Sequence, residues 1–157
     1  MPTATQKKQN LPEQVAGLLL QMNEVVLLLP NVAIAEIVGV SSIEKIPEKP
    51  EWYLGDIKWR ELNIPLVSYE GINERGIADI NNTSRIVIMN GIQGHSELSF
   101  YGLVCQGIPR LTRVFPREIS QEERSGHFAD HINLSVNGEA VIIPALERIE
   151  QVIISAL

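Results

Sequence analysis

The strongest constraint on the fold is a series of short apolar segments, separated by turn residues, that runs from Val15 almost to the end of the chain. Each segment has the length of a strand, and Asn, Pro and Gly residues are frequent between them. Many short strands with frequent turns predict a mainly β domain, either a barrel or a sandwich. The segments are Val15–Met22, Val25–Leu29, Val32–Val38, Tyr53–Trp59, Ile64–Tyr69, Ile86–Met89, Leu98–Cys105, Ile108–Val114, Ile132–Val136 and Ala140–Ile143.

The turn chemistry supports this interpretation. Asn137-Gly138 is the clearest hairpin prediction, because both residues tolerate the positive φ angles of a type I′ turn. The stretch Cys105-Gln106-Gly107-Ile108 predicts either a tight turn or a bulge.

Helix is expected chiefly at the C-terminus. Pro144 can occupy the first helical position, and the residues after it recur at helical spacing. The apolar residues with this spacing are Ala145, Leu146, Ile149, Val152 and Ile153. Single helical turns are also expected near Pro50–Leu54 and within Gln121–His131.

Length and composition predict one domain. The chain has 157 residues, of which 45% are hydrophobic, and a domain of this size buries enough surface to fold without covalent staples. Residues 1–12 are predicted to be a flexible tail, and residues 13–157 a single domain. The polar, Gly- and Asn-rich stretch 71–85 divides this domain into two strand-rich halves, which we expect to form two small barrels with a shared core.

Net charge and cysteine content indicate where in the cell the protein acts and which classes of partner it can bind. The formal net charge of -6 argues against nucleic acid as a partner, because the phosphate backbone repels an acidic surface. A single cysteine, Cys105, excludes an internal disulfide and favours a cytoplasmic protein. No apolar run reaches the roughly 18 residues of a membrane span, so any membrane link is expected to be indirect, through a partner.

Residues with catalytic or metal-binding potential are few. Cys105 ends an apolar run, which predicts a buried strand residue rather than a nucleophile. His127 and His131 are four residues apart, a possible metal spacing, but no further ligands accompany them, and both are expected to be exposed. Phosphate-binding Gly-rich motifs and Gly-x-Ser-x-Gly are absent from the sequence. We therefore expect no catalytic residue, no metal and no cofactor.

A linear order of motifs is more informative. The pair Glu36-Ile37 precedes a proline-bracketed loop, Pro47–Pro50. Leu54-Gly55-Asp56-Ile57 with Arg60 follows, then Ile64-Pro65-Leu66-Val67, and later Arg113–Glu118. In this order and spacing the chain resembles the CheW family, the proteins that couple receptors to a histidine kinase in bacterial chemosensory arrays. The resemblance covers nearly all of residues 15–155.

The resemblance implies a fold and two partners. The expected fold is mainly β and CheW-like, with two five-stranded SH3-like β-barrel subdomains side by side and a short C-terminal helix. A groove between the barrels would receive the cytoplasmic tip of a chemoreceptor, and the regulatory domain of a CheA-type histidine kinase would be the second partner. Two alternatives remain open: a decoy module that binds receptor or kinase without coupling them, and a small enzyme dependent on Cys105.

Six residues are candidates for protein binding: Glu36, Val38, Val40, Trp52, Gly55 and Arg60. Glu36 and Arg60 are expected to form an ion pair that joins two strands, and to contact the receptor only secondarily. Val38 and Val40 are expected either along the groove or in the core. Trp52 is expected to be exposed, as an aromatic interface residue, whereas Trp59 is expected in the core.

The chain also departs from the family pattern. Glu61 replaces the glycine that usually follows the arginine, and Gln106 replaces the aspartate of a Val-Val-Asp pattern. Ile143-Pro144-Ala145 stands where Leu-Asp-Leu is usual. These departures suggest a divergent member, from a type IV pilus-linked chemosensory system that controls twitching motility or from another non-flagellar system.

Overall fold

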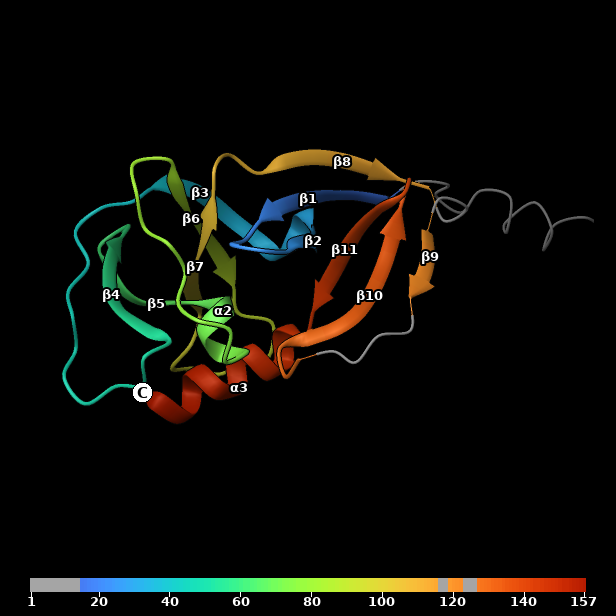
Figure 1. Cartoon of the computed structure of the whole chain (residues 1–157). Coiled ribbons are helices and arrows are strands. Elements are labelled where there is room, and N and C mark those ends of the chain that lie inside the picture. Colours follow the sequence, from blue (N-terminus) through green and yellow to red (C-terminus); the bar gives the residue numbers. More distant parts are fainter. Residues whose placement is uncertain (1–14, 116–118, 123–126) are drawn as a thin grey trace, which may run out of the picture.

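The apolar segments form the strands of two β-sheets in the computed structural model, which describes residues 15–115, 119–122 and 127–157 (Figure 1). In the first sheet, the six strands lie in the order β8 (Arg110–Val114), β1 (Val15–Gln21), β2 (Val26–Pro30), β11 (Glu139–Pro144), β10 (Asp130–Val136) and β9 (Ile119–Glu122). In the second sheet, the five strands lie in the order β3 (Ile34–Gly39), β6 (Ser84–Asn90), β7 (Phe100–Gln106), β5 (Leu62–Val67) and β4 (Tyr53–Trp59).

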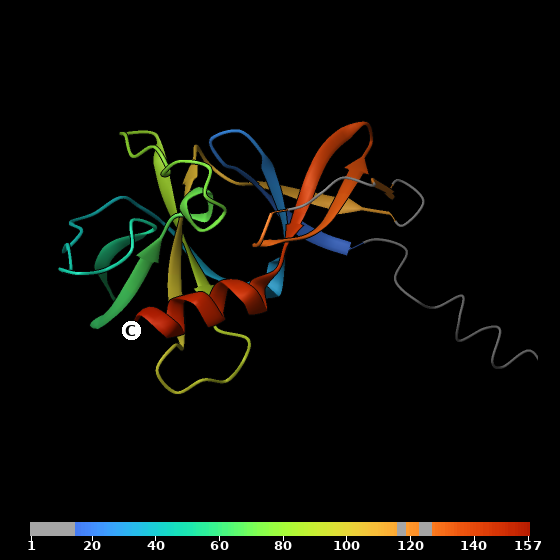
Figure 2. The same ribbon diagram turned by 60° about the horizontal axis from the view of Figure 1, so that its bottom comes forward.

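Short helices complete the described structure. A 3₁₀ turn, η1 (Asn31–Ala33), joins β2 to β3, and α2 (Tyr69–Ile72) follows β5. The C-terminal helix α3 (Leu146–Ala156) follows β11 and runs from the junction of the two sheets beneath the five-stranded sheet (Figure 2). The mainly β fold class and the short C-terminal helix are thus confirmed. The first sheet has six strands rather than five, because the short strand β9 adds to the edge of β10.

Each predicted apolar segment contains a strand, but the predicted helix start and the predicted helical turns are wrong. Pro144 ends β11 instead of beginning the helix, which starts two residues later. Pro50 and Tyr53 form a hydrogen-bonded turn rather than helix. The helical turn predicted within Gln121–His131 is wrong for its described residues, since β9 and a turn at 127–130 occupy them. The predicted tail, residues 1–12, lies outside the described residues.

The two sheets do not correspond to the two halves of the sequence. The five-stranded sheet is one continuous segment, β3 to β7, and the stretch 71–85 lies inside it, between β5 and β6. The six-stranded sheet combines the N-terminal strands β1 and β2 with β8 to β11. Pairing of β1 with β8 and of β2 with β11 joins the two ends of the chain. The predicted meeting of the halves near 71–85 is therefore wrong, because pairing between distant strands overrides the local break in apolar pattern.

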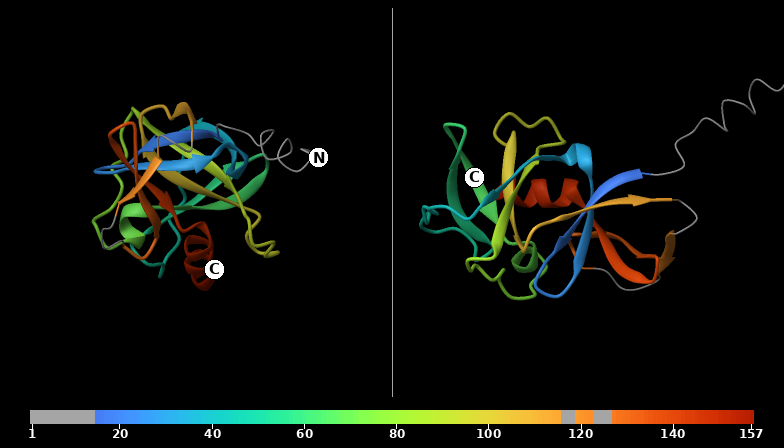
Figure 3. Two further views of the ribbon diagram at one scale, coloured as in Figure 1. Left: turned by 90° about the vertical axis from the view of Figure 1, so that its right-hand side faces the viewer. Right: turned by 90° about the horizontal axis from the view of Figure 1, so that it is seen from above.

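The largest apolar core lies between the sheets rather than inside either one. This shared core takes Leu20 and Leu27 from the first sheet, Val87 and Leu103 from the second, and Ile149 from α3. Each of these side chains is fully buried, which stabilises a fold by about 1.5–3 kcal/mol per residue. The shared core thus fixes the position of one sheet on the other (Figure 3).

Strands β6 and β7 are apolar on both faces because each face meets a different core. Val87 and Leu103 point into the shared core, whereas Ile86, Ile88 and Val104 point into the interior of the five-stranded sheet. A strand buried on both faces reads as a continuous apolar run rather than an alternating one. The interior of the six-stranded sheet is smaller, with Leu19, Leu134 and Val141 as its buried members.

Two hairpin turns place residues in the left-handed region. Asn137 (φ 51°) and Gly138 (φ 83°) connect β10 and β11, which confirms the predicted turn. The turn between β4 and β5 has the same form, with Arg60 at φ 49° and Glu61 at φ 65° between the paired residues Trp59 and Leu62. The family's usual glycine at position 61 thus coincides with a backbone conformation that glycine adopts at least cost.

Replacing Glu61 by glycine is therefore expected to stabilise the fold. The left-handed conformation costs a non-glycine residue about 1–2 kcal/mol, which exceeds the entropic cost of glycine, about 0.5–1 kcal/mol. We expect Glu61→Gly to raise the free energy of unfolding by about 0.5–1 kcal/mol, measured by urea denaturation. Glu61→Ala, which removes the charge but keeps a Cβ, is the control. An equal gain in both variants would assign the effect to the charge.

Cys105 lies on β7 in the shared core with no exposed surface. Burial raises the pKa of its thiol to about 11, because the apolar surroundings disfavour the thiolate. This confirms the prediction of a buried strand residue and leaves little thiolate at neutral pH.

We expect iodoacetamide at pH 7.5 to alkylate Cys105 at least about 100-fold more slowly in the folded protein than in urea, because a pKa raised from 9.0 to about 11 removes that much thiolate. The reaction is followed by mass spectrometry. The alkylation rate should increase as the pH rises toward 11. Rapid alkylation of the folded protein at pH 7.5 would show that the thiol is accessible and reactive.

Candidate functional site

The predicted ion pair between Glu36 and Arg60 is present and includes a third residue, Trp59. Glu36 lies on β3, and its Oε1 accepts hydrogen bonds from Trp59 Nε1 (3.0 Å) and from Arg60 Nη2 (3.3 Å). The Arg60 guanidinium also lies over the Trp59 ring, 4.5 Å from its centroid. These contacts join β3 to the β4–β5 turn, two segments that are not neighbours in the sheet.

The ion pair between Glu36 and Arg60 is exposed, whereas Trp59, which contacts both residues, is buried. The side chains of Arg60 and Glu36 keep 67% and 44% of their accessible surface, so the pair contributes at most about 1 kcal/mol to folding. Trp59 is buried, with its ring 4.8 Å from that of Phe100. The predicted core position of Trp59 is confirmed, and the charged groups above it remain available to a partner.

Val38 and Val40 lie close to this cluster but are half-buried. Both pack against the interior of the five-stranded sheet, where Trp59 and Ile86 are also found. Val38 pairs with Ile86 across β3 and β6. The two valines therefore support the strand that carries Glu36 and expose only part of their surface.

Gly55 and Trp52 are both closely packed against neighbouring segments. Gly55 has φ 145°, and a Cβ there would lie 2.5 Å from the carbonyl oxygen of Glu44. Two backbone hydrogen bonds between Glu44 and Asp56 (2.8 Å each) run beside it and close the edge of β4. Gly55 is thus needed for this close approach of two backbones. Trp52 is half-buried rather than exposed, because it packs against Gly71 in α2 and against the shared core.

Five apolar residues on β1, β3, β8 and the turn η1 stay wholly or partly exposed. Leu18, Ile34 and Ile37 pack against the shared core and stay partly exposed. Leu111, directly opposite Leu18 across β1 and β8, is 64% exposed, and Val32 in η1 is 85% exposed. Residues directly opposite in an antiparallel pair share a face, so Leu111 continues the apolar row of the shared core onto the surface. We call these five residues the β1–β3–β8 surface.

Sequence analysis did not identify Val32 or Leu111 as candidates. Both belong to apolar segments that predict strands, and strand residues at the edge of a core have the same composition as buried ones. The relevant signal, exposure, depends on β8 lying at the edge of its sheet.

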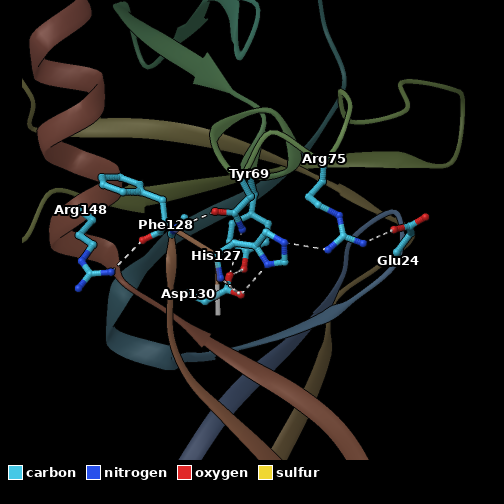
Figure 4. A network of polar contacts seen from close by, with 9 residues as sticks. Glu24, Tyr69, Arg75, His127, Phe128, Asp130 and Arg148 are labelled. Carbon is cyan, nitrogen blue, oxygen red and sulfur yellow. Dashed lines mark hydrogen bonds and ion pairs between the residues drawn. The ribbon is translucent and has the colours of Figure 1, made fainter. Parts of the chain in front are cut away.

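A polar cleft lies between α2 and the six-stranded sheet, with a volume of about 370 Å³. The Asp130 carboxylate on its wall accepts hydrogen bonds from the Tyr69 hydroxyl, from Asn73 Nδ2 (3.0 Å) and from the backbone N–H of His127 (3.1 Å) (Figure 4). Burial and the neighbouring Asp130 raise the pKa of Tyr69. These bonds tie the turn before β10 to α2.

The described histidines are not arranged as a metal site. His131 lies on strand β10 and His127 in the preceding turn, so they do not share a helix face; both are exposed as predicted. No group of three or more His, Cys, Asp or Glu side chains suited to a metal ion occurs in the described parts of the chain. None of the helices within these parts has the length and apolar character of a membrane span.

The comparisons with known proteins agree with the fold. The crystal structure of scaffolding protein TtCheW from Thermoanaerobacter tengcongensis is similar, with a TM-score of 0.71 and 22% sequence identity over 86% of each chain. A comparison with curated proteins gave no match.

A protein-family model matches the sequence itself. The model of the CheW-like domain matches residues 16–152, which is nearly the whole chain and includes both sheets. The likeness in structure supports the same fold independently. The chain therefore belongs to the family of CheW-like domains, whose members are non-enzymatic scaffolding and coupling proteins of chemotaxis signalling.

Proposed function

We propose that this protein couples the cytoplasmic tip of a chemoreceptor to the regulatory domain of a CheA-type histidine kinase. Receptor and kinase binding is the general role of CheW-like scaffolds, and the observation that carries the proposal for this chain is the β1–β3–β8 surface. A monomeric protein rarely leaves large apolar side chains together on its surface unless they bind a partner. The cytoplasm, where both partners would be found, is the proposed location.

The β1–β3–β8 surface suits an apolar partner. Leu111 and Val32 project from strands and turns that the shared core already holds in place, so little conformational freedom remains to be lost when a partner binds. The rigid support favours binding of a preformed element, such as a helix of the receptor tip, whose apolar residues would fill this surface.

Glu36 and Arg60 are proposed to form the charged margin of the receptor site. Glu36 is adjacent to Ile37 on the edge strand β3, so the apolar surface and the ion pair lie on opposite faces of one strand. Exposed charges at an interface margin orient a partner more than they add affinity. Val38 and Val40 belong to this site through the exposed part of their side chains.

Trp52 and Gly55 are proposed to contribute indirectly. Gly55 allows the segment at Glu44 to close the edge of β4, and this strand leads into the turn that carries Arg60. Trp52 fixes α2 against the sheet. Both residues would therefore preserve the shape of the binding surfaces without large contact areas of their own.

The departures from the family pattern at Gln106 and Pro144 have structural roles. Gln106 Nε2 donates to the backbone oxygen of Asp79 (2.7 Å), and its Oε1 accepts from Ser84 Oγ (3.2 Å). Pro144 ends β11 opposite Asp130. A divergent member of this kind fits a non-flagellar chemosensory system, and assignment to a pilus-linked system with twitching motility is part of the proposal.

Co-purification tests the proposed function. We expect the tagged protein to retain a soluble receptor signalling fragment and the kinase regulatory domain together, as a ternary complex measured by size-exclusion chromatography with light scattering. A coupling protein needs two compatible sites. A decoy would bind each partner only in the absence of the other. Binding of neither partner at concentrations up to about 100 μM, a weak affinity for a standard interface, would contradict the proposal.

Substitution of Leu111 tests the receptor surface. We expect Leu111→Glu and Val32→Glu each to weaken receptor binding at least about 10-fold, because an interface would then bury an unpaired carboxylate. Kinase binding is measured in parallel by isothermal titration calorimetry. Ile80→Glu is the matched control, since Ile80 is also an exposed apolar residue (45%) but lies in the 73–83 segment. Equal losses in all three variants, or no loss in any, would remove this surface from the receptor site.

A further inference from the structure

A histidine in the polar cleft links the two sheets through hydrogen bonds that depend on its protonation state. His127 lies in the turn that leads into β10 of the six-stranded sheet. Its Nε2 is 3.0 Å from Arg75 Nη1, and Arg75 lies just after α2 in the segment between β5 and β6 of the five-stranded sheet (Figure 4). Arg75 also contacts Glu24, in the β1–β2 turn, at 3.3 Å. Arg75 therefore connects one sheet to two turns of the other.

The chemistry of arginine fixes the state of His127 in this arrangement. A guanidinium group has only hydrogen-bond donors and stays charged at all pH values that proteins tolerate. His127 Nε2 must therefore be the acceptor, which requires a neutral ring with its proton on Nδ1. That nitrogen faces the Asp130 carboxylate, with 3.7 Å between Nδ1 and Oδ2. One neutral tautomer thus satisfies both neighbours.

Protonation of His127 weakens its interaction with Arg75 and strengthens its interaction with Asp130. A doubly protonated ring has no acceptor for Arg75 and carries the same charge as the guanidinium 3.0 Å away. Asp130 would attract the same ring more strongly. Among the described residues that line the cleft, the other charged groups are Glu24 beside Arg75 and Glu70, a buried carboxylate that accepts a hydrogen bond from the backbone of Asn23 (2.8 Å). Glu24 keeps its contact with Arg75 when His127 no longer accepts.

We propose that His127 is a pH-responsive contact between the two sheets: the neutral ring holds Arg75, and the protonated ring releases Arg75 while it stays bound to Asp130. Histidine is the side chain that ordinarily gains and loses a proton within the pH range that cells experience. Release would loosen the 73–83 segment, whose Asp79 N–H is bonded to Asn23 Oδ1 of the other sheet (3.2 Å).

NMR titration of the intact protein tests the proposal. We expect the Arg75 side-chain resonances to shift between pH 7.5 and pH 5.5 with the same midpoint as the ring signals of His127. Over the same range, the hydrogen-exchange protection factor of the Asp79 amide, corrected for intrinsic pH dependence, should fall at least about threefold as the segment opens locally.

Two variants distinguish the effect of protonating His127 from other effects of low pH on the protein. In His127→Gln, a neutral amide oxygen can accept from Arg75 at every pH, so the Arg75 resonances and the Asp79 protection should become independent of pH. In His131→Gln, which changes the exposed histidine four residues further along, both responses should persist. Arg75 signals that stay constant while wild-type His127 titrates would overturn the proposal. The same conclusion would follow if the response survived in a folded His127→Gln protein.

Discussion

Burial of apolar side chains between the two sheets is the interaction on which the rest of the structure depends. Strands β1 and β2 supply Leu20 and Leu27, the opposite sheet supplies Val87 and Leu103, and α3 covers one side of the shared core with Ile149. The interior of the six-stranded sheet buries far fewer side chains, with Leu19, Leu134 and Val141 as its buried members. The two sheets therefore act as one folding unit, although their strands pair separately.

This arrangement positions the surfaces that we propose for partner binding. At β1 and β8, the apolar row of the shared core continues into the exposed Leu111, and Val32 in η1 is also exposed. Polar side chains occupy another margin of the interface between the sheets, where Arg75 and Asp130 connect α2 to the six-stranded sheet. The thiol of Cys105 is buried in the same core with a raised pKa, which disfavours the nucleophilic thiolate at neutral pH.

The sequence predicted the strands well because strand formation depends on local composition. It also predicted the hairpin at Asn137 and the ion pair between Glu36 and Arg60. It missed β9, whose residues Ile-Ser-Gln-Glu have little apolar content and pair only at a sheet edge. The proposed binding surface was predicted in part: the charged pair was identified, but Leu111 was not, since its segment resembles any buried strand.

By itself, the sequence determined the fold class, the family and the absence of known catalytic motifs, because these depend on the order of apolar segments and on short motifs along the chain. The tertiary structure decided which strands share a sheet and which apolar side chains remain exposed. It also decided that Arg75 meets His127, although 52 positions separate them. Such contacts arise from long-range strand pairing and packing in three dimensions, which no local pattern of residues specifies.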